Sequence, residues 1–445
     1  MPIGDYIPGF NDPAQVAGWT SQQAFNGVST QGTDYAPSGS WQFRPESYGA
    51  AGDGSSDDSA AFRETMTAAC NHALNSPGRY AEIILSPSPY KIASATLPGT
   101  EQSNAQIPLT YVPRTTDRIE LAMIGSLDSG WFSNGYQTDG PRNGTVLLGT
   151  LTGQSYDATY GNPCLLGGWM PEQGAGNGAE YANMLLTLRG LAFVLPTNMT
   201  YSAVDVRGIA EVAIDRCVAT GDAPLTSMST WNAIGTTAYG FAMPMVTNNA
   251  YSKCTRVVSM GFQFGMLAGE HTDVDELGCV YNYYGLAING GGHPIHVGHY
   301  IAENNHSHIF PWTTTGSTGN PALIIDVMSS ENPTYVVDDA SNVIQGYIGF
   351  TQLQSNPTNN GGTNLKIVRL DENAGNIGSV TLPGTGSAFP IIWRDTVYTV
   401  TSGTVTAITV DGLDTGLTSG TIFVPSGKSF VMTYTGTPVV KGYVL

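Results

Sequence analysis

Between about Asp117 and about Ile348 the sequence contains many short apolar stretches of alternating pattern, separated by Gly, Asn and Asp. Examples are L-L-T-L-R-G-L-A-F-V at 185–194 and C-V-Y-N-Y-Y-G-L-A-I-N-G at 279–290. Because successive side chains of a strand point to opposite faces, this pattern is typical of short strands joined by turns. No apolar periodicity of helix length interrupts these stretches. The central region is therefore predicted to be nearly pure β structure.

Weak repeats indicate how these strands are arranged. Cys254, Cys279 and His299 precede similar strand-to-glycine stretches, at intervals of 25 and 20 residues. Such spacings are typical of a solenoid, in which each coil packs only on its neighbours. We expect the stretches 153–181 and 220–238 to be insertions that project as loops.

Composition agrees with an all-β chain and excludes some partners. Charged residues make up 12% of the sequence and Gly occupies 55 positions, so the surface is built largely from small polar residues. The net charge is −18, with 35 acidic and 17 basic residues and no basic cluster. Nucleic-acid binding needs a concentrated positive field and is not expected. No apolar run approaches about 18 residues, so we expect no membrane insertion.

The N-terminus and the cysteines indicate where the chain is made. The first residues, M-P-I-G-D-Y-I-P-G-F, have neither a charged n-region nor an apolar h-region, so we predict synthesis in a cytoplasm without a signal peptide. The five cysteines contain no C-x-x-C pair, which argues against a zinc site and a disulfide framework. We predict buried, reduced thiols.

A glycine- and aspartate-rich stretch, S-Y-G-A-A-G-D-G-S-S-D-D-S at 47–59, precedes the only clear helical pattern. It lacks the lysine of a phosphate-binding loop and the closing glutamate of a calcium loop. A tight turn at 52–54, followed by a helix over 57–75 capped by Ser56 or Asp57, accounts for the residues. The buried face of this helix is predicted to contain Phe62, Met66, Ala69, Cys70 and Ala73.

The string "YGAAGDGSSDDSAAF", the short helix and the following "IILSPSPYKIAS" resemble the N-terminal capping segment of the pectate-lyase-like right-handed β-helix superfamily. That segment is common in bacteriophage tailspikes and minor tail proteins. The ending "SGTIFVPSGKSFVMTYTGTPVV" is similar to terminal modules of siphophage tail proteins. The resemblance implies a receptor-binding homotrimer in the virion, attached to other phage tail proteins through its N-terminal segment.

The predicted fold class is all-β: a right-handed parallel β-helix with an N-terminal capping helix and a C-terminal antiparallel β-module. We expect a virion-attachment or linker segment at 1–40 and the β-helix at 41–348. A transition segment is expected at 349–388 and the β-module at 389–445. The pairs Asp411-Gly412 and Ser426-Gly427 are predicted to form hairpin turns in that module.

Six of the seven histidines and several acids lie between 270 and 308. Asp273 and Asp275 are two residues apart, just under about 7 Å on one strand face, which suits an inverting glycosidase. Glu303 adds a third carboxylate from a later coil. These three are the candidate catalytic residues, although solvated turn positions at the end of a coil are the commoner outcome for residues like Asp273 and Asp275. Few basic residues lie nearby, which favours hydrolysis over a lyase reaction.

The same region contains candidate glycan-binding residues. Aromatic rings on a solenoid face can stack on sugar rings while polar neighbours bind the hydroxyl groups. Tyr281 and Tyr283 share a face if their stretch is a strand, and a purely structural aromatic ladder is the alternative. The full candidate set is Tyr281, Tyr283, Tyr284, His299 and Trp312.

The histidine spacing also raises the question of a metal site. His306 and His308 are two apart, which would place them on one strand face where they could hold an ion. Polar residues of β-helices are more often hydrogen-bonded surface positions. We therefore predict no metal ion and no cofactor.

Two functional hypotheses remain. The first is a phage tail spike or minor tail protein that recognises a host cell-surface polysaccharide during adsorption without cleaving it. The second is a glycan depolymerase, an endo-glycosidase rather than a lyase, on the same β-helix. A secreted pectinase-like enzyme is a third reading, which the missing signal peptide and the phage-like C-terminal ending disfavour.

Overall fold

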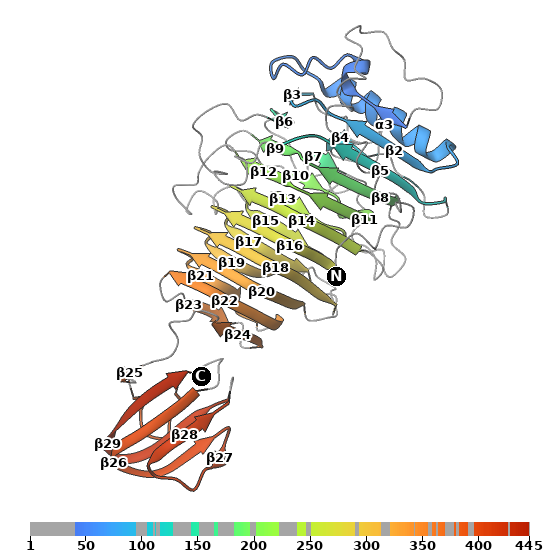
Figure 1. Cartoon of the computed structure of the whole chain (residues 1–445). Helices are drawn as coiled ribbons and strands as arrows, with labels where there is room; N and C mark the ends of the chain where they lie inside the picture. The colour runs from blue at the N-terminus through green and yellow to red at the C-terminus, as the bar shows by residue number, and fades with distance from the viewer. Residues whose placement is uncertain are drawn as a thin grey trace, which may run out of the picture. The chain divides into compact units, whose positions relative to one another are not determined.

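The computed structural model describes most of the chain from residue 41 onward (Figure 1). The described residues are 41–94, 105–109, 112, 116–127, 144–150, 164–167, 182–195, 202–221, 238–245, 251–289, 293–312, 321–341, 343–354, 358–361, 364–369, 378–379, 382–389, 396–425 and 428–444. The predicted attachment segment 1–40 lies outside them. Within them, no helix is long and apolar enough to cross a membrane.

The predicted helix is present as α3 (Ser59–Asn75), which follows a short 3-10 helix, η2 (Pro45–Tyr48). Its buried face contains Phe62, Met66, Ala69, Cys70 and Ala73, as expected. This face joins the hydrophobic core of the first coils, where Phe62 lies edge-on to Tyr90 at 5.1 Å between ring centroids. The helix therefore covers the N-terminal end of the core (Figure 1).

The aspartates before the helix organise the turn rather than bind a ligand. Asp57 accepts a hydrogen bond from the Ser59 N–H at 3.1 Å, so it satisfies a donor of the first helical turn. The Asp58 carboxylate is buried and accepts from the backbone of Ala51 at 2.6 Å. Burial raises the pKa of Asp58. The predicted turn is confirmed, but the helix begins at Ser59 rather than at 57, and its N-cap residue, Asp58, makes no side-chain capping hydrogen bond.

Two parallel sheets wind around one core, with 15 and 9 strands among the described residues. The main row of the 15-stranded sheet, here sheet A, contains β1 (Gln42–Phe43), β2 (Tyr80–Ile84), β5 (Ile119–Ile124), β8 (Ala182–Arg189), β11 (Ile209–Asp215), β14 (Tyr251–Met260), β16 (Thr272–Val280), β18 (Pro294–Glu303), β20 (Ala322–Glu331), β22 (Gln345–Gln354) and β24 (Leu365–Arg369). A branch of sheet A contains β3 (Pro89–Ile92), β6 (Val146–Gly149), β9 (Ala192–Leu195) and β12 (Cys217–Gly221). The 9-stranded sheet, here sheet B, contains β4 (Ala105–Pro108), β7 (Cys164–Gly167), β10 (Ser202–Asp205), β13 (Tyr239–Ala242), β15 (Phe264–Ala268), β17 (Tyr284–Asn289), β19 (Ser307–Trp312), β21 (Tyr335–Asp339) and β23 (Thr358–Gly361).

The branch is a third face of the early coils. β14 pairs with β11 through residues 251–254 and with β12 through residues 257–260, so from this coil onward two faces are formed by one long strand. The parallel β-solenoid of the predicted fold class is thereby confirmed. The predicted insertion 153–181 is wrong in part, because it contains β7, whose four residues are all buried. Residues 222–237 of the other predicted insertion lie outside the described residues.

The coils are unequal in length, which corrects the predicted repeat. The register aligns Lys253 with Asp273, His296, Ile324 and Tyr347, so successive coils contain 20, 23, 28 and 23 residues. Cys254 therefore does not correspond to Cys279, which pairs with Ser259. The repeat read from the sequence therefore does not match the alignment of residues between neighbouring coils.

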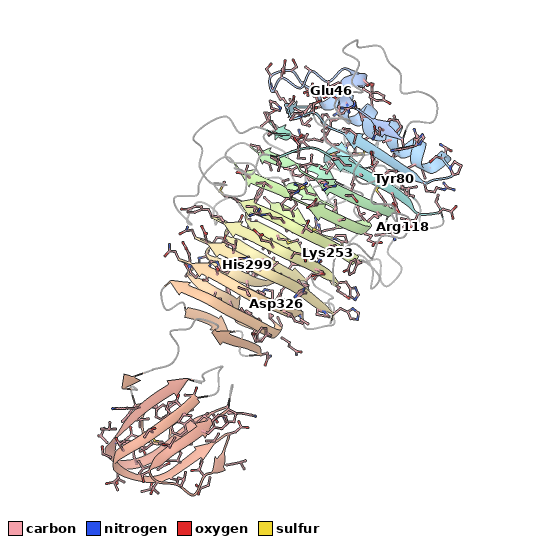
Figure 2. All side chains as sticks on the ribbon, in the orientation of Figure 1. Glu46, Tyr80, Arg118, Lys253, His299 and Asp326 are labelled. Atoms are coloured by element: carbon pink, nitrogen blue, oxygen red, sulfur yellow. The ribbon has the colours of Figure 1, made fainter. Side chains whose placement is uncertain are left out.

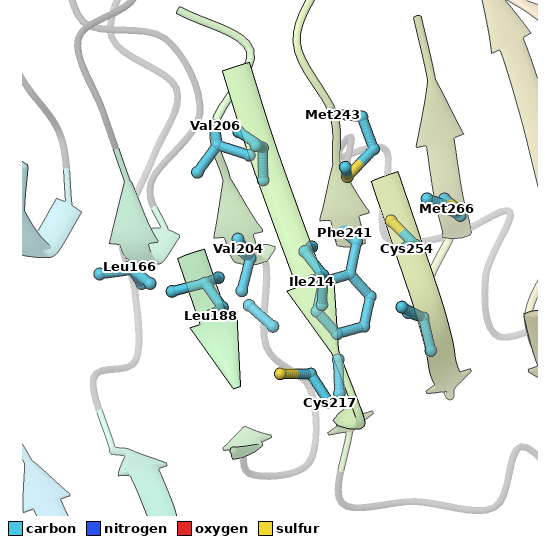
Figure 3. Close-up of a cluster of buried hydrophobic side chains, with 14 of the residues drawn as sticks. Leu166, Leu188, Val204, Val206, Ile214, Cys217, Phe241, Met243, Cys254 and Met266 are labelled. Carbon is cyan, nitrogen blue, oxygen red and sulfur yellow. The ribbon is translucent and has the colours of Figure 1, made fainter. Parts of the chain in front are cut away.

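Apolar side chains from the facing sheets fill the core (Figure 3). Leu188, Ile214 and Cys254 come from successive strands of sheet A. Val204, Phe241 and Met266 face them from sheet B. All five cysteines are buried and free, as predicted, and burial raises the pKa of the Cys217 thiol to about 12.

One corner of the solenoid is held by stacked asparagines. The Phe262 N–H donates to Asn282 Oδ1 at 3.0 Å, and the Asn282 N–H donates to Asn305 Oδ1 at 2.8 Å. Both amide groups also donate to backbone carbonyls of the preceding coil, at 3.1 Å and 2.8 Å. The asparagine side chains thus provide hydrogen-bond partners for buried backbone groups at the corner, where strand pairing does not provide them.

The parallel pairing continues through β24, into the stretch 349–388 that was predicted to be a transition segment. A separate antiparallel sheet follows, with its own buried cluster around Phe389, Tyr398, Ile408 and Phe430. It contains β25 (Gly378–Ser379), β26 (Thr396–Val410), β27 (Leu413–Asp414), β28 (Gly420–Val424) and β29 (Phe430–Val444).

This sheet is the antiparallel module of the predicted fold class. Asp411 and Gly412 have φ of 52° and 77°, which is the predicted tight hairpin turn. The second predicted turn, at 426–427, lies outside the described residues.

Candidate functional site

The predicted acid pair lies on the outer face of sheet A. Asp273 and Asp275 share one face of β16, as expected, with the buried Val274 between them. Lys253, on the preceding coil, bridges them: its Nζ lies 2.9 Å from Asp273 Oδ2 and 2.5 Å from Asp275 Oδ1. The two carboxylates therefore share one ammonium group.

The network continues to later coils. Asp273 Oδ1 lies 2.8 Å from His296 Nδ1, and His296 Nε2 lies 3.0 Å from Asp326 Oδ2. Burial raises the pKa of Asp273, but hydrogen bonds from His296 and Lys253 outweigh it, so this pKa is lowered. The hydrogen bond to Asp273 is the main reason that the pKa of His296 is raised.

We call this network the charge ladder, and it consists of Lys253, Asp273, Asp275, His296 and Asp326. Its residues lie on strands of four successive coils, and Figure 2 labels Lys253 and Asp326. A general acid needs a raised pKa, whereas the pKa of Asp273 is lowered. The ladder suits an ion-pair network on a solvated surface, where each pair contributes about 0–1 kcal/mol.

Glu303 lies elsewhere. It follows His296, the register partner of Asp273, by seven residues along β18, which corresponds to roughly 23 Å of strand. Its own register partner is Glu331 on β20. Burial, and then the charge of Glu331, raise the pKa of Glu303. The structure thus brings Glu303 to Glu331 and not to Asp273 or Asp275.

Glu331 was missed in the sequence, although a signal existed. The dipeptide Glu-Asn occurs at 303–304 and again at 331–332. Both asparagines have left-handed backbones, with φ of 52° and 48°. A repeated acid directly before a left-handed asparagine marks the same position in two coils.

A row of aromatic rings lies on the outer face of sheet B. Phe264 stacks on Tyr284 at 5.1 Å between centroids, and Tyr284 stacks on Phe310 at 4.0 Å. Trp312 meets Phe264 edge-on at 5.0 Å. We call the connected set the aromatic strip: Phe264, Tyr283, Tyr284, His306, Phe310, Trp312 and Tyr335.

The second half of the strip runs over the turns that precede β17 and β19. Tyr283 lies edge-on to Tyr284 at 4.6 Å and stacks on His306 at 4.5 Å. His306 meets Tyr335 edge-on at 5.5 Å. Burial lowers the pKa of His306, and Asp338 opposes that effect. The strip therefore crosses several coils without a break in ring contact.

The apolar clusters show which of these rings lie outside the solenoid core. Met266, Leu286 and Ile309 are aligned in neighbouring strands and belong to the solenoid core. Phe264 and Tyr284, which are also register partners, belong to a separate apolar cluster outside it. Tyr239 and Phe264 are buried at the base of this cluster, whereas Tyr284, Phe310 and Trp312 are only partly buried.

Polar atoms accompany the rings. Trp312 and Asn289 are register partners, and Trp312 Nε1 and Asn289 Oδ1 are buried without a hydrogen-bond partner in the described part of the chain. Burial, followed by the charges of Tyr283 and Asp338, raises the pKa of Tyr284. The two unpartnered polar atoms are thus covered by the protein, and the Asp338 carboxylate is the polar group that acts on the rings.

Three of the five predicted glycan-binding residues, Tyr283, Tyr284 and Trp312, belong to the strip. Tyr281 does not share a strand face with Tyr283, because the chain turns there and Tyr281 has a φ of 54°. His299 lies on the outer face of sheet A as the register partner of Glu276 (Figure 2). The residues that the sequence interpretation missed are Phe264, His306, Phe310 and Tyr335.

The predicted histidine pair also separates. His308 is fully buried and contacts the Asn305 amide nitrogen through Nδ1 at 3.1 Å, whereas His306 stacks on Tyr283. These two side chains do not share one open strand face.

Comparison with family models gave no match, and comparison with curated proteins gave none either. Among solved structures, PfbA, a surface adhesin of Streptococcus pneumoniae, is 12% identical, with 75% of this chain and 74% of that chain covered and a TM-score of 0.30. The tailspike of Acinetobacter phage vB_ApiP_P1 is 11% identical, with coverages of 95% and 91% and a TM-score of 0.32. The tailspike of Acinetobacter baumannii phage AM24 is 9% identical, with coverages of 91% and 79% and a TM-score of 0.25. These comparisons establish no family.

Proposed function

We propose that this protein is a phage tail spike or minor tail protein that binds a host cell-surface glycan through the aromatic strip. The observation that carries the proposal is the continuous row of rings from Tyr335 to Trp312. The resemblance of the N-terminal capping segment and the C-terminal ending to phage tail proteins supports the virion assignment. Neither the row of rings nor the resemblance of the terminal segments requires a catalytic group.

The physical basis is stacking combined with hydrogen bonding. The C–H face of a sugar ring packs on an aromatic ring, and its hydroxyl groups reach polar atoms at the edge of that ring. The Asp338 carboxylate, whose charge acts on Tyr284, suits that second role. The net charge of −18 disfavours a strongly anionic polysaccharide, because the two would repel each other.

The proposal is tested by titrating polysaccharide from a susceptible host into the purified full chain in a calorimeter. We expect Trp312→Ala and Tyr284→Ala each to weaken binding about two- to tenfold, as expected for the loss of one aromatic contact. Trp41→Ala is the matched control, because Trp41 is a half-exposed aromatic outside the strip. Equal affinities for all four proteins would exclude the strip as the binding surface.

A second candidate function is glycan hydrolysis at Glu303 and Glu331. Parallel strands lie about 4.8 Å apart, near the carboxylate separation of about 5–5.5 Å in retaining glycosidases. The raised pKa of Glu303 supports its role as the acid. New reducing ends that disappear in Glu303→Gln but persist in Asp273→Asn would support this site. Activity that is lost in Asp273→Asn but persists in Glu303→Gln would support Asp273 and Asp275 as the catalytic pair.

The resemblance to phage tail proteins also implies how this protein assembles. We propose that three copies associate, and that residues 1–40 connect them to other tail proteins. Light scattering with the full chain measures the copy number, and a chain that begins at Trp41 separates the two roles. Loss of virion attachment with glycan binding retained is the expected outcome for the shortened chain.

A further inference from the structure

We infer that Glu270, His271 and His293 form a binding site for a divalent transition-metal ion, with Zn²⁺ the best-suited ion. Each residue offers one ligand atom, and the three atoms lie within 4.8 Å of one another. The site is distinct from the charge ladder and from the aromatic strip, because it shares no residue with either.

The backbone of two neighbouring coils brings these residues together. Glu270 and His271 form the turn between β15 and β16, and His293 directly precedes β18 in the next coil. The pairing of β16 with β18 begins at Asp273 and His296, and the contact of Glu270 with His293 lies just before it. The ion would therefore connect successive coils of the solenoid at one corner.

The side chains are already close. His293 Nδ1 lies 2.5 Å from Glu270 Oε2, and the rings of His271 and His293 stack at 4.5 Å between centroids with 22° between their planes. Tetrahedral zinc has its ligands about 2.0–2.1 Å from the ion, which places two ligand atoms about 3.4 Å apart. The ligand atoms, now within 4.8 Å of one another, must therefore approach by up to about 1.4 Å, and the direct Glu270–His293 contact must open.

The side-chain exposures permit this adjustment. The His293 side chain is 47% exposed and can rotate, whereas Glu270 is 19% exposed and better fixed. His271 lies at the turn with a left-handed backbone, φ 57°. Glu270 is thus the better fixed ligand, and His293 can close on the ion.

The ligand set selects the class of ion. Two imidazoles and one carboxylate suit Zn²⁺, Ni²⁺, Cu²⁺ or Fe²⁺, whereas Ca²⁺ and Mg²⁺ prefer oxygen ligands only. Three protein ligands leave a coordination position for water or for an oxygen of another molecule. The negative net charge of the chain favours the approach of cations.

The test uses the untagged full chain, zinc chloride as the probe, and both calorimetry and thermal unfolding. We expect one Zn²⁺ bound per chain and an unfolding midpoint that rises with zinc concentration. Three variants remove one ligand each: Glu270→Gln, His271→Asn and His293→Ala. Asn tolerates the left-handed backbone at 271, which protects the fold of that variant.

Each ligand variant is expected to bind zinc about tenfold or more weakly, since even outer-shell changes cost 10–100-fold. His299→Ala, which removes a half-buried histidine of β18 outside the proposed site, should bind as the parent does. Circular dichroism confirms that each variant is folded. Absence of stoichiometric zinc binding in the parent overturns the inference. So does binding that the three ligand variants retain, or that the control loses equally.

Discussion

The buried His308 predicts that stability falls as the pH is lowered. Its side chain is fully buried, and burial lowers its pKa from 6.5 to about 3. Nδ1 faces the Asn305 amide at 3.1 Å, so it accepts a hydrogen bond and the proton of the neutral ring is on Nε2. Nε2 is buried without a partner in the described part of the chain. Tyr300 donates its hydroxyl to the His308 backbone carbonyl oxygen at 2.7 Å.

The sign and size follow from proton linkage. The unfolded chain binds a proton at His308 near pH 6.5, whereas the folded chain binds it only near pH 3. The contribution to stability is therefore complete above pH 6.5 and is lost progressively as the pH falls toward 3. Between pH 7.5 and pH 5.0 the loss is about 2 kcal/mol, since the unfolded state gains about 1.4 kcal/mol per pH unit below 6.5.

The assay is urea unfolding of the parent and of His308→Gln at pH 7.5 and pH 5.0. The variant is less stable at pH 7.5, but its own decrease between the two pH values should be smaller than that of the parent by about 2 kcal/mol. If the glutamine variant does not fold, His308→Leu serves as a second variant, with an apolar side chain at this position. Equal pH-dependent losses in the parent and in a folded variant would refute the assignment of a neutral, buried His308.

Three further outcomes concern stability and are measured by urea unfolding of single variants. Asn282→Ala should cost about 1–3 kcal/mol, because it leaves the buried N–H of Phe262 without its acceptor; a cost near zero contradicts the corner model. Arg207→Ala should cost about 3–5 kcal/mol, because its guanidinium pairs with the buried Asp205 at 2.6 Å; a neutral result would mean that water replaces it. Lys253→Ala should cost less than about 1 kcal/mol despite its two carboxylate partners, and a larger cost would show that the ladder is structural.

Much of the fold could be predicted because its signals are local. Strand alternation, the helical spacing of Phe62 and Met66, and the Asp411-Gly412 turn depend only on nearby residues. The same holds for Asp273 and Asp275, whose i, i+2 spacing fixes a common face within one strand. Local patterns gave the right fold class and the right face for this pair.

The candidate sites could be predicted only in part, because they depend on register between coils. Coils of 20, 23, 28 and 23 residues have no constant period that would align Tyr284 with Phe264, or Glu303 with Glu331. A single residue of slip moves every side chain to the opposite face. The Lys253 bridge, the aromatic strip and the Glu270–His293 contact all join different coils, and none has a local sequence signal.

Glycan binding by the aromatic strip is best tested by a crystal structure of the full chain soaked with oligosaccharides prepared from the host surface polysaccharide. We expect sugar rings stacked on Phe310 and Trp312, with hydroxyl groups near Asp338. Sugar bound only over the Asp273 ladder, or no sugar on the outer face of sheet B at saturating ligand, would contradict it.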